Sequence, residues 1–355
     1  IQREILLSIF PEEEASKYQD KLQVIFGDIK EENFGIGLGS FQELAAKTDA
    51  VYHLAAVTNL GSSLIEAREN NLQGTLNVLS FCHASKENQA RKSPIKLFHV
   101  STAYVAGTKT GVFTPEDLDI SVKFKNGYEQ SKAEAEAAVR GSGLDFMIFR
   151  PSMIVGSSYT GKTSAFNIIY LPAKLVAKGL FKALPAIGST PVDLIPVDYV
   201  ADAIVEISLN QLSTNERNFH LTVGVNRESS PIEIMECLFD VLKDHKKVSQ
   251  IATQLLPLVP EDLVYKAASG FSSAFIEVEK IISKRLPILQ QIFPLVPYMT
   301  SNPRFDSSAT EKVLKSTKIK APQFRDYGEK IFNYCLDTNW GKKAWSNPRN
   351  LKEWW

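Results

Sequence analysis

"IKLFHVSTAYV" (95–105) is the stretch that most decides the fold. It is a mainly apolar run of strand length that ends in the hydroxyl residues Ser101 and Thr102. Such runs are typical of parallel strands that are covered on both faces. Further strands are predicted at 22–29, 50–57, 144–155 and 218–224. Helical segments are predicted before the first of these runs, at 11–20, and between the runs at 40–47, about 64–86 and 128–140. This alternation predicts an α/β fold with a doubly wound parallel sheet.

The pattern changes beyond residue 205 and indicates a second region. "SSPIEIMECLFDVLKDH" (229–245) begins a new helix with Ser-Ser-Pro at its start, a typical helix N-terminus. The chain then looks mainly helical, with several prolines that interrupt it. We therefore predict a cofactor-binding domain at 1–229 and a mainly helical C-terminal substrate or cap domain at 230–355.

Composition narrows the class of protein. The 355 residues include 40 basic and 40 acidic side chains, so net charge gives no reason to expect a nucleic-acid partner. The three cysteines lie far apart, which argues against a disulfide framework or a metal site and favours a reducing compartment. With no signal peptide and no long uncharged apolar run, we expect a cytoplasmic location. The opening "IQREILLSIF" has no initiator methionine and suggests a fragment.

The first candidate chemistry lies in "NGYEQSKAEAEAAVRGSG" (126–143), where Tyr128 precedes Lys132 by four residues. Such a spacing places the two side chains next to each other on a helix. A free tyrosine has a pKa of about 10, and an ammonium group one turn away favours the phenolate. The spacing thus predicts a phenol whose pKa is lowered for proton transfer. The alternative is an exposed helix with an accidental match.

Polar residues follow the predicted strands where a ligand would bind. In an open parallel sheet, ligands bind beyond the carboxyl ends of the strands, which is where Ser101 and Thr102 lie. Asn71 interrupts an otherwise apolar helix and needs a partner, so we expect it to anchor a neighbouring loop that holds Tyr128 or Thr102. The structural alternative is that these groups only cap local backbone.

Taken in order, these motifs resemble the extended short-chain dehydrogenase/reductase superfamily, with its Rossmann-like fold. The similarity covers residues 1 to about 225, and its thioester-reductase branch includes fatty acyl-CoA reductases and male sterility proteins. The motifs that carry it are GD (27–28), HLAA (53–56), N-x2-GT (71–75), STAYV-x-G (101–107), Y-x3-K (128–132) and RPSMIVG (150–156). "SNPRFDSSATEKVL" (301–314) is more loosely similar to the C-terminal part of fatty acyl-CoA reductases.

The resemblance implies roles for individual residues. Thr102, Tyr128 and Lys132 would form the catalytic triad, in which Lys132 also binds the nicotinamide ribose. Asp198 would be a structural anchor. Residues expected at the cofactor, besides Tyr128 and Lys132, are Asp28, Ile29, Ala55, Ala56, Val57, Asn71, Ser101, Pro151 and Ser152. The implied cofactor is NADPH, with NADH not excluded.

One element of the family pattern is missing from this sequence. The first strand and its glycine-rich loop, which approaches a pyrophosphate at a helix N-terminus, are not found. "GIGLGS" (35–40) follows "GDIKEENF" rather than joining a strand directly to a helix, so we reject it as the phosphate site.

The resemblance implies NADPH-dependent reduction of a fatty acyl thioester, on coenzyme A or acyl carrier protein, to the aldehyde or on to the alcohol. Nucleotide-sugar epimerases or dehydratases and hydroxysteroid-type dehydrogenases share the triad and stay as alternatives. A non-catalytic NAD(P) sensor is a third reading, although such proteins typically lose the Tyr or Lys.

The C-terminal region leaves two further questions open. The apolar segment 258–299 suits either a cap over an acyl chain or a helical core. Tryptophans at 340, 345, 354 and 355 accompany basic residues, which is the pattern of a peripheral membrane contact or of a packed terminal helix.

Overall fold

The computed structural model describes Gln2, Leu6 and residues 12–86, 95–166, 168–179, 188–210, 216–244, 293–300 and 302–342. Most of the apolar segment 258–299 lies outside these residues, as do three of the four tryptophans. Trp340 is buried in the core. In the part of the chain that is described, no helix is long and apolar enough to cross a membrane.

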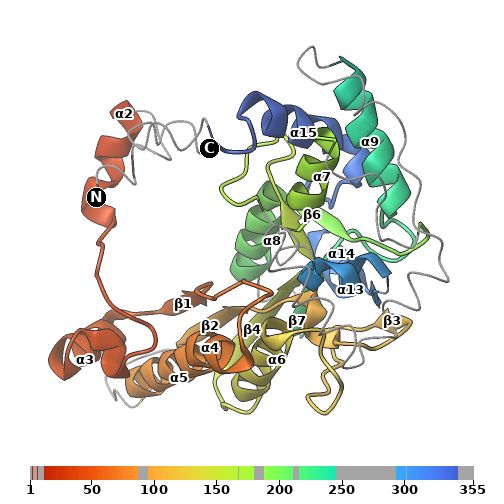
Figure 1. The fold of residues 1–355 in the computed structure, drawn as a ribbon. Coiled ribbons are helices and arrows are strands. Elements are labelled where there is room, and N and C mark those ends of the chain that lie inside the picture. Colours follow the sequence, from red (N-terminus) through yellow and green to blue (C-terminus); the bar gives the residue numbers. More distant parts are fainter. Residues whose placement is uncertain are drawn as a thin grey trace.

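A parallel sheet confirms the predicted fold class. Its strands are β1 (Ala50–His53), β2 (Lys96–Val100), β4 (Asp145–Pro151) and β7 (Asn218–Leu221), in the order β1-β2-β4-β7 (Figure 1). All three pairings are parallel, and Phe98 of β2 stands opposite Tyr52 of β1 and Met147 of β4. The carboxyl ends of these strands therefore meet at one edge of the sheet, which is where a ligand is expected.

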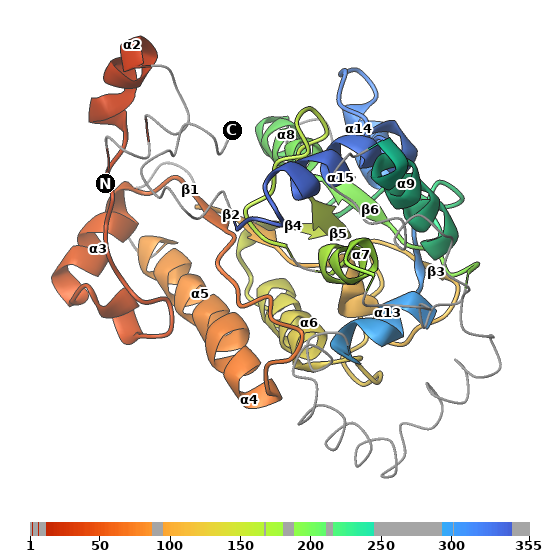
Figure 2. The same ribbon diagram turned by 45° about the horizontal axis from the view of Figure 1, so that its top comes forward.

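Both faces of the sheet are covered by helices, as doubly wound folds require. Helices α5 (Gln73–Lys86) and α6 (Gly127–Arg140) lie side by side on one face (Figure 2). Helices α8 (Val197–Leu209) and α14 (Ser308–Leu314) cover the other. Successive side chains of a strand point to opposite faces of the sheet. In β2, Leu97 therefore packs in the apolar cluster on the α5 side, and Phe98 packs in the cluster on the α8 side.

The remaining elements connect or flank these layers. They are α2 (Glu12–Ala15), η1 (Ser16–Lys21), η2 (Glu32–Gly35), α3 (Leu38–Lys47), α4 (Leu64–Ala67), the π-helical turn η3 (Arg68–Leu72), η4 (Ala103–Ala106), β3 (Val112–Phe113), β5 (Met153–Val155), α7 (Tyr170–Ala177), β6 (Leu194–Pro196), α9 (Pro231–Asp244), η7 (Phe293–Leu295), α13 (Val296–Thr300), β8 (Arg304–Phe305), η8 (Phe324–Asp326) and α15 (Gly328–Asp337).

One predicted strand is wrong. Residues 22–28 run without regular secondary structure, and a turn follows at 29–30. A strand forms only where its backbone groups pair with a neighbouring strand, and the described sheet ends at β1. Ile25 and Phe26 of this segment are exposed instead of buried.

The C-terminal region packs directly onto the first 229 residues. Strand β8 pairs with β3, and α14 packs on β7. A single apolar cluster joins Tyr104 and Met153 to Leu238, Tyr298 and Phe332. A division at 229–230 stays a prediction, but the described residues on its two sides share this core.

The loop after β5 contacts α15 closely. Gly161 has φ +73°, and a Cβ there would overlap the carbonyl oxygen of Lys330. Lys330 also donates from Nζ to the carbonyl of Ser158, at 3.0 Å. The loop is therefore held against α15 by backbone proximity that only glycine permits.

We expect Gly161→Ala to lower the free energy of unfolding by roughly 3 kcal/mol, because strain at positive φ adds to a backbone clash. The matched control is Gly143→Ala, at φ +69°, where a Cβ would contact no described atom within 4 Å. That variant should cost only about 1 kcal/mol, from strain alone. Urea unfolding measures both, and equal losses would contradict the packing of the loop on α15.

Candidate active site

Helix α6 carries the predicted phenol and ammonium on one face. Asn126 caps the helix by accepting a hydrogen bond from the backbone N–H of Glu129, at 3.0 Å. From there, every fourth residue lies in one stripe along the helix, so that Tyr128, Lys132, Glu136 and Arg140 follow one another. Lys132 and Glu136 are buried, and Tyr128 is partly buried.

The end of β2 supplies the third predicted group. Thr102 follows the strand by two residues, its hydroxyl forms a hydrogen bond with the Tyr128 phenol, and it is 4% exposed. Lys132 donates from Nζ to the carbonyl oxygen of Val100, the last residue of β2, at 2.8 Å. The structure therefore brings Thr102, Tyr128 and Lys132 together.

These three groups line a cleft of about 1550 Å³ at the carboxyl ends of the strands. Ligand pockets for one small molecule occupy about 300–1000 Å³, so the cleft has room for more than one ligand. The predicted site residues that line it are Ala56, Ser101, Thr102, Tyr128, Lys132, Pro151 and Ser152.

The pKa of Tyr128 in the structure differs from the value expected from the sequence. Burial raises the pKa of Tyr128 to about 12, although the hydrogen bond with Thr102 opposes this. Burial also lowers the pKa of Lys132 to about 8, against the attraction of Glu136. The predicted lowering of the Tyr128 pKa is thus wrong for this structure, because the lost hydration of the phenolate dominates and the charge of Glu129 acts in the same direction.

Asn71 has the anchoring role that its position in an apolar helix predicted. It lies in the π-helical turn η3, and its Oδ1 accepts from the backbone N–H of Val57, at 2.8 Å. Its Nδ2 donates to the carbonyl of Val57 and to the hydroxyl of Ser131. Asn71 thereby ties the loop after β1 to α6, one residue from Lys132.

Other predicted cofactor residues lie away from the cleft lining. Asp28 accepts a hydrogen bond from the backbone of Lys30 in a turn, and Ile29 packs against Gly74 of α5. Ala55 is exposed, and Val57 is held by Asn71. Their contact with a cofactor stays a prediction.

Two carboxylates support the walls of the cleft. Asp198 accepts from the backbone N–H and the hydroxyl of Ser158, at 2.7 and 2.6 Å, which fits the predicted anchor. Asp193 accepts from the Ser152 hydroxyl at 2.6 Å and so orients a residue that lines the cleft. Burial raises the pKa of Asp193 to about 7.

A group that the sequence did not reveal joins α6 to the C-terminal region. Tyr298 of α13 lines the cleft and donates its hydroxyl to Glu129 Oε1 at 2.6 Å. Asn126 Nδ2 donates to the same hydroxyl, and Lys125 lies over the Tyr298 ring at 4.5 Å. Glu129 beside the predicted catalytic Tyr128 was a visible signal, but nothing in the sequence pointed to its partner.

The residues present fit the nicotinamide end of a dinucleotide. An ammonium group has three N–H donors, and Lys132 uses one on Val100, so two remain for ribose hydroxyls. The short side chain of Ala56 after β1 leaves room for a ligand close to the backbone. Lys132, Tyr128, Ala56 and Pro151 would hold this part of the cofactor.

Comparison with known proteins agrees with the geometry. Residues 1–204 match the male sterility protein family. The L-2-aminoadipate reductase of Saccharomyces cerevisiae is 28% identical over 211 residues, which are 56% of this chain and 15% of that protein. The chain spans about a fifth or less of the length of the curated relatives it matches first.

Solved structures share the fold. The terminal R domain from the myxalamid PKS-NRPS biosynthetic pathway has a TM-score of 0.69 and 24% identity, covering 94% of this chain and 79% of that one. UDP-glucose 4-epimerase from Bifidobacterium longum has a TM-score of 0.57 and 20% identity, covering 93% and 88%. With the motifs and the matched residues, these findings confirm the predicted resemblance: the chain belongs to the NAD-binding male sterility protein family.

Proposed function

We propose that the chain reduces a fatty acyl thioester, carried on coenzyme A or on acyl carrier protein, to the aldehyde with NADPH. A second reduction of a retained aldehyde would give the alcohol. The observation that carries the proposal is the meeting of Thr102, Tyr128 and Lys132 at the inner wall of one large cleft. The family to which the chain belongs and its aminoadipate reductase relative support it.

In this mechanism the bound cofactor would supply the hydride that the thioester carbonyl carbon accepts. Tyr128 donates its proton to the carbonyl oxygen, and the Thr102 hydroxyl donates a second hydrogen bond to that oxygen. Lys132 binds the ribose hydroxyls and stabilises the phenolate that Tyr128 leaves behind. The resulting hemithioacetal breaks its C–S bond to release the aldehyde and the free thiol.

The rest of the cleft lining suits an acyl chain and its carrier. It includes apolar side chains, among them Met153, Phe166, Ile168, Leu171 and Leu295. Lys162 and Lys174 also line it, and Lys178 and Lys342 lie close enough for their charges to act on Lys174. Apolar side chains together with lysines in one cleft fit a fatty acyl chain joined to a phosphate-bearing arm.

The direct test is consumption of NADPH by the purified full chain with palmitoyl-CoA, with product analysis by gas chromatography. UDP-glucose serves as the control substrate for the epimerase alternative. Hexadecanal or hexadecanol would support the proposal. Binding of NADPH without turnover of any acyl thioester would favour a cofactor sensor instead.

We expect Tyr128→Phe to lower kcat by roughly 10²–10⁴-fold with little change in NADPH affinity, because only the proton donor is removed. Tyr159, an exposed tyrosine of the same cleft, provides the matched control, and Tyr159→Phe should stay within about twofold of wild type. Lys132→Ala should weaken both cofactor binding and turnover. Wild-type turnover by Tyr128→Phe would refute the assigned role.

We expect Lys174→Glu to raise KM for palmitoyl-CoA about tenfold or more, because a charge-assisted contact with phosphate is lost. Its kcat should change little, since Lys174 has no part in the proposed hydride and proton transfers. Palmitoyl-N-acetylcysteamine has the same thioester but no phosphate and is the control substrate. An equal rise in KM for both substrates would exclude phosphate recognition by Lys174.

A further inference from the structure

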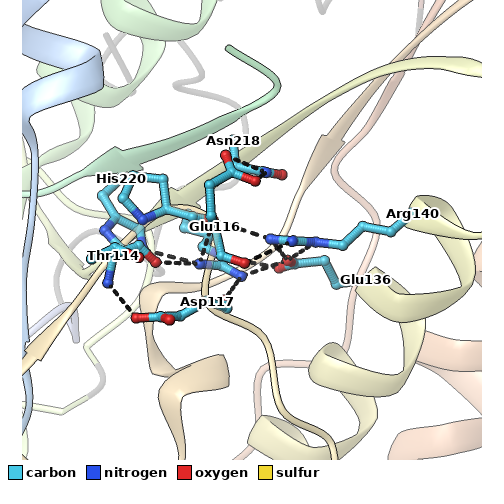
Figure 3. A network of polar contacts seen from close by, with 9 residues as sticks. Thr114, Glu116, Asp117, Glu136, Arg140, Asn218 and His220 are labelled. Carbon is cyan, nitrogen blue, oxygen red and sulfur yellow. Dashed lines mark hydrogen bonds and ion pairs between the residues drawn. The ribbon is translucent and has the colours of Figure 1, made fainter.

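A buried ionic network continues the stripe of α6 that carries Tyr128 and Lys132, one turn further towards the C-terminus of the helix (Figure 3). Glu136 and Arg150 are both fully buried. Arg150 of β4 donates from Nη2 to Glu136 Oε1 at 2.6 Å and from Nε to Oε2 at 3.0 Å. Arg140 of α6 donates from Nε to Glu136 Oε1 at 3.0 Å. The carboxylate is therefore held in one orientation by two guanidinium groups.

Arg150 itself is fixed from several sides. It donates to the carbonyl oxygens of Pro115 and Asp117 at 3.1 and 2.7 Å. Its Nη1 also donates to His220 Nε2 at 3.1 Å, and His220 donates from Nδ1 to the carbonyl of Asp306 at 2.9 Å. Burial lowers the pKa of His220 to about 3, so the ring is neutral and can accept this bond.

Lys132, one helical turn from Glu136, is 2% exposed. The groups that face it from the sheet are His53 of β1 and His99 of β2, and burial lowers the pKa of both rings, so that neither carries charge near neutral pH. On α6 itself it is flanked by the neutral Tyr128 phenol and by Glu136. Among these groups, Glu136 alone brings a negative charge to the buried ammonium.

We propose that Glu136 is a positioning residue of the catalytic centre, whose carboxylate, clamped by Arg150 and Arg140, compensates the buried charge of Lys132 and keeps that ammonium protonated and aimed at the cleft. The proposal rests on the proposed function only for the role of Lys132 in turnover. If the pair of Glu136 and Arg150 were purely structural, it would not need the ammonium of Lys132 nearby. Apolar residues of similar volume would then often pack as stably as the ion pair.

The first test needs no substrate. Lys132 has a pKa of about 8 in the folded protein against an ordinary 10.5, so the unfolded chain binds more protons in this window. Its contribution to the free energy of unfolding therefore rises with pH between those values. In Glu136→Gln, the pKa of Lys132 falls further, and we expect the rise to begin about one pH unit lower.

Urea unfolding of the full chain from mildly acidic to alkaline pH measures this onset. Lys125, whose pKa burial also lowers to about 8, titrates in the same range, so each curve is compared with its Lys132→Met counterpart. The shift should vanish in the Lys132→Met background. An unchanged onset in Glu136→Gln would overturn the proposal even if that variant is less stable.

Two further variants separate charge compensation from packing. Arg150→Lys keeps the positive charge but loses the bidentate geometry, so stability should fall without a shift in onset. Arg140 is partly exposed, and Arg140→Gln removes a cation that competes for Glu136. In this variant the rise in the free energy of unfolding should begin at higher pH. If Glu136→Gln does not fold, Arg140→Gln therefore still tests whether Glu136 compensates the charge of Lys132. No shift in Arg140→Gln would count against the proposal.

Turnover gives the second readout. The alkaline limb of the kcat/KM profile should move about one pH unit lower in Glu136→Gln, and an added Lys132→Arg should abolish that shift because arginine stays charged. If kcat/KM of Glu136→Gln falls by the same factor at every pH, the proposal is contradicted. If no thioester is reduced at all, the proposed function fails while the unfolding result still decides the role of Glu136.

Discussion

The ion pair between Glu136 and Arg150 is the contact on which the candidate site depends. It joins α6, which carries Tyr128 and Lys132, to β4, which pairs with both β2 and β7. Two buried charges lose their hydration, and only bidentate geometry with further hydrogen bonds offsets that loss. Removing one partner of such a pair typically costs about 3–5 kcal/mol, so the same bonds hold both the orientation of α6 and its attachment to the sheet.

The regular geometry of α6 means that fixing Glu136 also positions the phenol of Tyr128. With 3.6 residues per turn, fixing Glu136 also fixes Lys132 and Tyr128 on the same face, one and two turns towards the N-terminus. The start of the helix is fixed separately, since a Cβ at Gly127 would lie 2.8 Å from the Cα of Leu64. Asn71 adds a third attachment through Ser131. Helix α6 is therefore held at several points.

The parts of this arrangement that depend on local spacing were predictable from the sequence. Tyr128 and Lys132 are one helical turn apart, and Thr102 follows an apolar strand, so both could be placed without knowing any distant contact. The strand expected at 22–29 failed because an apolar run cannot reveal whether a neighbouring strand exists. Tyr298 was out of reach because it meets Glu129 across 169 residues. The pKa of Tyr128 was misjudged because spacing reports the nearby charge but not the depth of burial.

That last difference bears on the protonation state of Tyr128. A phenol with a pKa near 12 keeps its proton at neutral pH, which the proposed role as a proton donor requires, but the raised pKa also makes it a weaker acid. In the proposed mechanism, the ammonium group of Lys132 matters most once the proton has left, because only the phenolate is charged. The proposed role of Lys132 thus depends on its own charge surviving burial, and the carboxylate that opposes the fall of its pKa is Glu136.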